Sequence, residues 1–191
     1  DLVIKNNSLI ASTQGRGLWI IDNLEPIRKA NKSIQKPQLF TPNPSLRDYG
    51  SSQEKPTPHG KNLPSEIMLY SYFPNWSKKD TALIFLISDS NDTVSISSNF
   101  PTASQNKVEI KAGSNLILIP YTGSPATSFD NMVLWWSSLK GPSAYPGQYK
   151  IILKSNAFTD SLYCRIDKDP RFPVTDEDVK KNYDFILTYI K

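Results

Sequence analysis

Residues 141–153 have the sequence Gly141-Pro142-Ser143-Ala144-Tyr145-Pro146-Gly147-Gln148-Tyr149-Lys150-Ile151-Ile152-Leu153, which combines a turn with a strand. Proline suits the first central position of a β-turn, and glycine accepts the positive φ that a type II turn needs at the next position. Pro146 and Gly147 therefore predict a turn with Gly147 at positive φ. From Tyr149 onward, every second residue is apolar, as expected of a strand with one buried face.

The same alternation recurs between residues 66 and 168 in short segments separated by turn-forming residues. The predicted strands are Glu66–Phe73, Ala82–Ser88, Thr93–Ser97, Lys107–Lys111, Asn115–Pro120, Met132–Trp136, Gln148–Lys154 and Ser161–Asp167. Their predicted core-facing side chains are Ile67, Leu69, Ser71, Phe73, Leu83, Phe85, Ile87, Leu116, Leu118, Tyr149, Ile151, Leu153, Leu162, Cys164 and Ile166. This pattern predicts an all-β protein with an antiparallel sandwich of the immunoglobulin or fibronectin III type at 66–168.

The N-terminal third has a different character. Residues 1–23 predict a β-meander, because short apolar runs are separated by Asn, Ser and Gly residues. Three short strands are not stable alone, so the meander needs a partner surface. Residues 24–65 are rich in proline and predict a connector with little regular structure, in which Gln38-Leu39-Phe40 is a candidate edge strand.

The C-terminal residues 169–191 predict an exit segment and an amphipathic helix. Asp169-Pro170-Arg171 predicts a rigid exit with a local ion pair. Thr175 is the expected N-cap, and acidic residues follow it in the first turn. The apolar face of the helix comprises Val179, Tyr183, Ile186, Leu187 and Ile190. This face needs cover from the sandwich, from another helix or from a second copy of the chain.

Composition excludes several classes of protein and site. No run of 18 apolar residues is present, so no membrane span is expected. The single cysteine, Cys164, excludes an intrachain disulfide, and the single histidine, His59, excludes a site with several His ligands. The net charge of +4 comes from interrupted basic residues without a dense stripe, so no nucleic-acid partner is expected. Neither a cofactor nor a metal is expected.

Several stretches in order resemble one family. Leu9-Ile10-Ala11-Ser12-Thr13-Gln14-Gly15-Arg16-Gly17-Leu18-Trp19-Ile20-Ile21-Asp22 is similar to the last blade of secreted bacterial BNR-repeat, sortilin-like β-propellers, which are often labelled glycosyl hydrolases. The stretches that resemble the rest of their C-terminal part are Leu39-Phe40-Thr41-Pro42, Gly141-Pro142, Pro146-Gly147-Gln148-Tyr149 and Asp169-Pro170-Arg171. The resemblance implies an upstream propeller as partner and a secreted, periplasmic or cell-surface location. In related glycosidases the catalytic acids lie on the propeller, so no catalytic residue is expected here.

Adjacent tryptophans are the best candidates for a ligand site. Trp135 and Trp136 lie on a predicted strand, where neighbouring side chains point to opposite faces. One is therefore expected in the core and the other outside, where it could stack on a sugar ring with Tyr145 or Trp76 beside it. The alternative is that the connector or the terminal helix covers the outer tryptophan.

Three functions remain open from the sequence. The first is a non-catalytic accessory domain of a larger secreted propeller protein, acting in packing, spacing or protein contact. The second is a carbohydrate-binding module, and the third is a fragment of a glycoside hydrolase whose catalytic residues lie in the propeller. A second copy of the chain is a further expected partner, because the apolar side chains of both ends need cover.

Overall fold

The computed structural model describes residues 1–29, 35–47, 64–127, 129, 131–133, 139–156 and 158–190. The strands of this part are β1 (Leu2–Lys5), β2 (Ser8–Ser12), β3 (Leu18–Ile21), β4 (Gln38–Phe40), β5 (Ser45–Arg47), β6 (Ile67–Phe73), β7 (Ala82–Ile87), β8 (Thr93–Ser98), β9 (Asn106–Lys107), β10 (Gly113–Ile119), β11 (Gly147–Ser155) and β12 (Thr159–Lys168). Its helices are α1 (Glu25–Lys29) and α2 (Asp176–Ile190). The all-β class and the C-terminal helix are thus confirmed.

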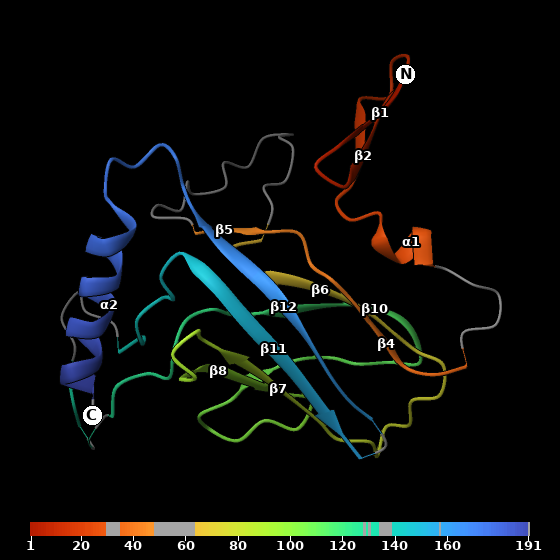
Figure 1. Cartoon of the computed structure of the whole chain (residues 1–191). Coiled ribbons are helices and arrows are strands. Elements are labelled where there is room, and N and C mark those ends of the chain that lie inside the picture. Colours follow the sequence, from red (N-terminus) through yellow and green to blue (C-terminus); the bar gives the residue numbers. More distant parts are fainter. Residues whose placement is uncertain are drawn as a thin grey trace.

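Two sheets contribute to a common core (Figure 1). One sheet has the strand order β10-β6-β4, and the other has the order β5-β12-β11-β7-β8-β9. A single cluster of buried side chains takes members from both, among them Leu69 and Ile117 from the first sheet and Ile84 and Ile151 from the second. Burying one such side chain contributes about 1.5–3 kcal/mol, so this shared core holds the two sheets together.

The strand β11 forms as predicted, with Tyr149, Ile151 and Leu153 buried. The hydroxyl of Tyr149 donates a hydrogen bond of 2.6 Å to the main-chain oxygen of Tyr145. This bond ties the start of the strand back onto the segment before it. The prediction of positive φ at Gly147 is wrong, because Gly147 is already the first residue of β11.

The buried face of β7 is opposite to the predicted one. The side chains that face the core are Ala82, Ile84 and Leu86. The predicted set, which is only half-buried, is Leu83, Phe85 and Ile87. Since β7 is a continuous apolar run without polar alternation, its sequence does not decide which face is buried. Pairing with β11 decides it, because Ile84 lies opposite Leu153, which points into the core.

The same reversal occurs in β10, where the prediction for Leu116 and Leu118 is wrong. These two side chains are 48% and 37% exposed, respectively. The residues that face the core are Asn115, Ile117 and Ile119. Asn115 is buried although it is polar, because its side-chain amide makes three hydrogen bonds of 2.9 Å to the main chain of residues 111–113. A polar side chain that is satisfied locally can occupy a core-facing position.

The sandwich takes two strands from the range 24–65 that the sequence predicts as a connector. β4 is an edge strand that pairs antiparallel with β6, as predicted for Gln38-Leu39-Phe40. β5 pairs in parallel with β12, and β8 pairs in parallel with β9. The expectation of a wholly antiparallel sandwich is therefore wrong at these two pairings. The chain passes from one sheet to the other between β4 and β5, so the sandwich includes residues before 66.

Two predicted strands differ from the structure. In the segment Lys107–Lys111, only Lys107 lies in a strand, β9. Met132 and Val133 lie outside any strand, and residues 134–136 fall outside the described part of the chain. Val108 is buried in the core, so the segment before β10 contributes to packing without pairing over its length.

Helix α2 begins with a reciprocal cap and docks on the sandwich. The main-chain N–H of Asp178 donates to Thr175 Oγ1 at 3.1 Å, and the Thr175 hydroxyl donates to Asp178 Oδ2 at 2.6 Å. Thr175 is thus the N-cap that the sequence predicts, and its hydrogen bonds lower the pKa of the Asp178 carboxyl. Val179 and Tyr183, on the predicted apolar face, are buried against Tyr145.

Asp169 and Arg171 form the predicted local ion pair between β12 and α2. The guanidinium Nε of Arg171 donates to both carboxylate oxygens of Asp169, at 2.9 and 3.0 Å. Asp169 has no accessible surface, whereas the side chain of Arg171 is 74% exposed. These hydrogen bonds lower the pKa of the Asp169 carboxyl.

The N-terminal strands form the predicted meander, with the antiparallel order β1-β2-β3. Figure 1 shows β1 and β2 extending away from the sandwich, far from α2. The exposed large apolar side chains of the meander are Leu2, Val3, Ile4, Leu18, Trp19, Ile20 and Ile21. Docking on the sandwich, one of the predicted ways of covering the chain ends, is therefore seen for α2 and not for the meander.

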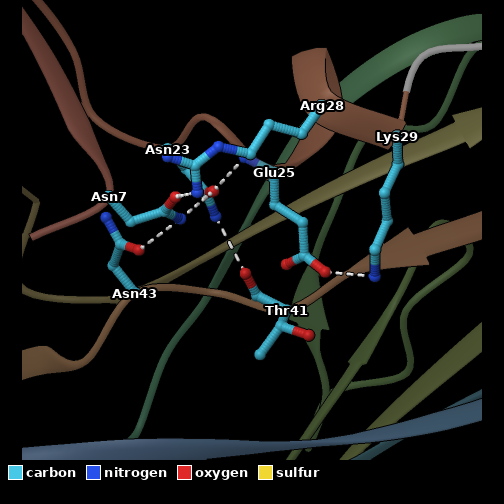
Figure 2. A network of polar contacts seen from close by, with 7 residues as sticks. All are labelled: Asn7, Asn23, Glu25, Arg28, Lys29, Thr41 and Asn43. Carbon is cyan, nitrogen blue, oxygen red and sulfur yellow. Dashed lines mark hydrogen bonds and ion pairs between the residues drawn. The ribbon is translucent and has the colours of Figure 1, made fainter. Parts of the chain in front are cut away.

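A set of polar contacts, the junction network, connects the meander to the sandwich (Figure 2). Its centre is Asn23, which follows β3 and is only 3% exposed. Asn23 Oδ1 accepts hydrogen bonds from Asn7 Nδ2 and from the main-chain N–H of Glu25, both at 2.8 Å. Asn23 Nδ2 donates to the main-chain oxygen of Thr41 at 2.8 Å, so β3 is tied to the segment that follows β4.

Asn7 makes the second half of the junction network from the turn between β1 and β2. Its Nδ2 also donates to Asn43 Oδ1 at 3.2 Å, and its Oδ1 accepts a hydrogen bond of 2.6 Å from Arg28 of α1 (Figure 2). Asn43 in turn donates to the main-chain oxygen of Asp22. The network therefore ties the β1–β2 turn and the residues that follow β3 to the β4–β5 segment and to α1.

Among the described residues, neither helix is both long enough and apolar enough to cross a lipid bilayer.

Candidate binding sites

The meander presents apolar side chains on both of its faces. The strand register places Ile4, Leu9 and Ile21 in one row across the sheet, and Val3, Ile10 and Ile20 in the next row on the opposite face. The further members of the two faces are Leu2, Ala11 and Trp19 on the first and Leu18 on the second. A sheet at a protein surface is usually polar on one face, whereas a sheet between two layers is apolar on both. The meander has the pattern of an interior layer.

Both edges of the meander are also open within the described structure. β1 and β3 each pair only with β2, so their outer main-chain groups are available to another strand. Exposed edge strands of this kind are templates for pairing with another chain. The meander therefore offers two faces and two edges to a partner.

A second candidate site surrounds Trp76, in the loop between β6 and β7. The Trp76 ring packs on Phe73 with a centroid separation of 5.1 Å, so part of the indole lies against the core. The remaining part is accessible and lines a groove of about 600 Å³. Asp80 closes the loop, because its carboxylate accepts a hydrogen bond of 2.7 Å from the main-chain N–H of Ser77.

Polar side chains fix the walls of the Trp76 groove. Asn99 accepts a hydrogen bond of 2.8 Å from the main-chain N–H of Ala82 and donates one of 2.7 Å to the main-chain oxygen of Asp80. Asn115 also lines the groove and is held by its three bonds to the main chain of residues 111–113. These two amides are thus satisfied by the protein, and they make the groove a preformed site.

The charged residues of the groove are mostly basic. They are Lys78, Lys107, Lys111 and Glu109. Three lysines and one glutamate give these residues a net formal charge of +2. None of these four side chains takes part in an ion pair among the described residues. The groove therefore combines an aromatic wall with positive charge that has no ion-pair partner in the described part of the chain.

The sequence analysis selected only Trp76 in this groove. Lys107, Glu109 and Lys111 alternate with Val108 and Ile110, which is the signal that could have pointed to them. The sequence indicates that the three charged side chains share one face. It does not indicate that this face lies beside Trp76, about 30 residues earlier.

Tyr145 is not available for stacking on a sugar, because α2 covers it. Its side chain is 6% exposed, and its ring lies 5.3 Å from that of Tyr183 and 5.0 Å from Lys180 Nζ. The Tyr145 hydroxyl donates to Asp89 Oδ1 at 2.6 Å. Burial, together with this hydrogen bond, raises the pKa of Tyr145 to about 12, and the same bond lowers the pKa of Asp89. Tyr145 is thus a structural residue that anchors the helix.

The remaining sequence candidates do not add to the groove. Trp135 and Trp136 lie outside the described residues, so the prediction of one buried and one exposed ring stays a prediction. Cys164 is buried in the core, and desolvation raises the pKa of its thiol to about 12. Such a thiol is not a reactive nucleophile at neutral pH.

Two further observations bear on chemistry and relationship. Within the described residues, no group of three or more His, Cys, Asp or Glu side chains is arranged to hold a metal ion. Comparison of the chain with family models, with curated proteins and with solved structures gives no match. A functional assignment therefore depends on the geometry of the two candidate sites.

Proposed function

We propose that this chain is a non-catalytic interaction module, in which a β-sandwich holds a β-meander ready to dock into a larger β-protein. The observation that carries the proposal is the meander, which is apolar on both faces and exposed. Leaving several large apolar side chains in water forgoes about 1.5–3 kcal/mol for each. The junction network around the buried Asn23 nevertheless ties this sheet to the sandwich. A segment held in this way is suited to binding a partner.

Two features support an immunoglobulin-type sandwich as the scaffold. Constant immunoglobulin domains have the strands ABED in one sheet and CFG in the other. If β4, β6, β7, β10, β11 and β12 are lettered A, B, C, E, F and G, the two sheets contain the orders A-B-E and C-F-G. The bond from the Tyr149 hydroxyl to the main chain of Tyr145, near the start of β11, also has the form of a tyrosine corner.

The proposed partner is a β-propeller that precedes this sandwich in the parent chain. Propeller blades are four-stranded sheets arranged around a central channel, and neighbouring blades cover both faces of each. The meander would supply three strands of such a blade. The resemblance of Leu9–Asp22 to the last blade of BNR-repeat, sortilin-like proteins supports this partner. The parent protein would then be a secreted, periplasmic or cell-surface protein of a bacterium.

A second copy of the chain is a weaker candidate for the partner. Two copies that met through one face of the meander would cover Val3 and Ile20 or Ile4 and Ile21, but not both pairs. The other face would remain in water. A partner that forms layers on both sides satisfies the whole pattern.

The experiment is to measure sedimentation velocity and binding of the dye ANS with this chain alone. We expect concentration-dependent association and ANS binding, and we expect Ile20→Lys and Ile21→Lys, on opposite faces, each to reduce both without lowering Tm. Leu118→Lys, at an exposed position of β10, is the matched control and should change neither. A wild-type chain that stays monomeric and binds no ANS would contradict the proposal.

Carbohydrate binding is a second candidate function, and the groove at Trp76 favours it. A fragment of a glycoside hydrolase is less well supported. Hydrolysis of a glycoside requires a pair of carboxyl groups on either side of the scissile bond. Among the described residues that line this groove, Glu109 is the one carboxylate. Catalysis by the parent protein would then depend on carboxyl groups outside this groove.

A further inference from the structure

We propose that the Trp76 groove binds an acidic oligosaccharide, with carboxylate or sulfate groups on its sugar rings. This inference rests on the carbohydrate-binding candidate and adds the class of ligand. It is independent of the docking role of the meander, because the groove is built from the β6–β7 loop, Asn99 after β8 and the residues before and within β10.

The aromatic wall indicates a flat ligand with an apolar face. An indole ring buries a large apolar surface and keeps a specific geometry toward its partner. Packing on Phe73 holds the ring of Trp76 in place, so little conformational freedom is lost when a ligand stacks on its accessible part. The C–H face of a pyranose ring matches such a surface. The groove volume of about 600 Å³ also lies within the range of small-ligand sites, about 300–1,000 Å³.

The charges indicate that the ligand is an anion. Lys78, Lys107 and Lys111 line the groove and are all exposed. Among the described residues of the groove, Glu109 is the single opposing charge. A lysine ammonium is a compact point charge that suits carboxylate and sulfate groups at varied positions. Asn99 and Asn115 are already satisfied by main-chain groups, so the lysines supply most of the polar recognition.

A single-stranded nucleic acid fits the groove less well. Proteins that bind such strands stack successive bases on several aromatic side chains and follow the backbone with a charged track. Among the described residues of the groove, Trp76 is the one aromatic side chain, and the three lysines are confined to the same cavity. One or a few sugar rings with acidic groups fit the groove volume of about 600 Å³ and the grouping of its lysines better.

The test is isothermal titration calorimetry with tetragalacturonate, with neutral cellotetraose and with a ten-nucleotide oligo-dT. We expect tetragalacturonate to bind at least about tenfold more tightly than the other two, a difference of about 1.4 kcal/mol. Its affinity should fall as salt rises, because ions screen exposed charges. Lys107→Ala and Lys111→Ala should weaken it several-fold and reduce the salt dependence. Glu109→Gln should strengthen it.

The matched control is Lys79→Ala, next to Lys78 in the sequence but not part of the groove, and it should leave the affinity unchanged. Trp76→Ala should abolish binding, and the lysine variants keep the test valid if that variant fails to fold. Equal binding of cellotetraose, lost in Trp76→Ala, would support a carbohydrate site and overturn the acidic class. Tighter binding of oligo-dT, binding that Lys79→Ala weakens as much as Lys107→Ala, or no binding at all would overturn the proposal.

Discussion

Replacing Tyr149 with phenylalanine removes one oxygen atom from the base of the sandwich. The side chain is 1% exposed, and its hydroxyl donates to the main-chain oxygen of Tyr145 at 2.6 Å. In the variant this oxygen loses its donor in a place that water does not reach easily. A buried polar group left unsatisfied costs about 1–3 kcal/mol. We expect the free energy of unfolding to fall by about 2 kcal/mol, and Tm by about 4–8 °C for a chain of this size.

The assay is equilibrium unfolding in urea, followed by circular dichroism, with a thermal scan of the same samples. Tyr163→Phe is the matched control, since it makes the same change on β12 at a side chain that is 59% exposed. Exposed substitutions of this kind usually change stability by less than about 0.5 kcal/mol. If Tyr149→Phe and Tyr163→Phe differed by less than this amount, the hydrogen bond would not stabilise the corner and the reasoning would be refuted.

Three further changes test other parts of the structure. Asn23→Ala removes three hydrogen bonds of the junction network, so amide exchange measured by mass spectrometry should accelerate in β1–β3 by about tenfold or more and stay unchanged in β11. The bond from Tyr145 lowers the pKa of Asp89 below its ordinary 3.8, so its stabilising contribution is complete above that value and is lost as pH falls through the lowered pKa. Asp89→Asn should therefore lower Tm at pH 7 and flatten the decline of Tm in acid, measured by thermal scans at a series of pH values. The hydroxyl of Ser97 is buried without a hydrogen-bond partner in the described structure. Ser97→Ala should therefore leave the free energy of unfolding unchanged or raise it by about 1 kcal/mol. A fall of more than about 1 kcal/mol in urea unfolding would contradict this.

Several features could be predicted from the sequence because they depend on residues a few positions apart. The cap of α2 joins Thr175 to Asp178, and the ion pair before the helix joins Asp169 to Arg171. The strand that begins near Tyr149 has alternating polarity, and that pattern alone predicts its buried face. In each case the interacting groups lie within one turn or one strand. Local geometry then decides the outcome.

Other features were decided only when distant segments met. The runs in β7 and β10 contain adjacent apolar residues, so their buried faces depended on pairing with β11 and β6. From its local sequence, Tyr145 was a candidate for an exposed stacking residue. In the structure it contacts Asp89 and Tyr183, which are both far away in the sequence, and it is buried.

The sequence by itself determined the all-β class, the meander and the terminal helix, because hydrophobic period and capping chemistry are properties of neighbouring residues. Only the tertiary structure brought Lys107 and Lys111 beside Trp76, and only the tertiary structure left both faces of the meander in water. The burial of a side chain and the shape of a groove depend on several segments that are far apart along the chain and meet only in the folded protein. No single stretch of sequence therefore determines them.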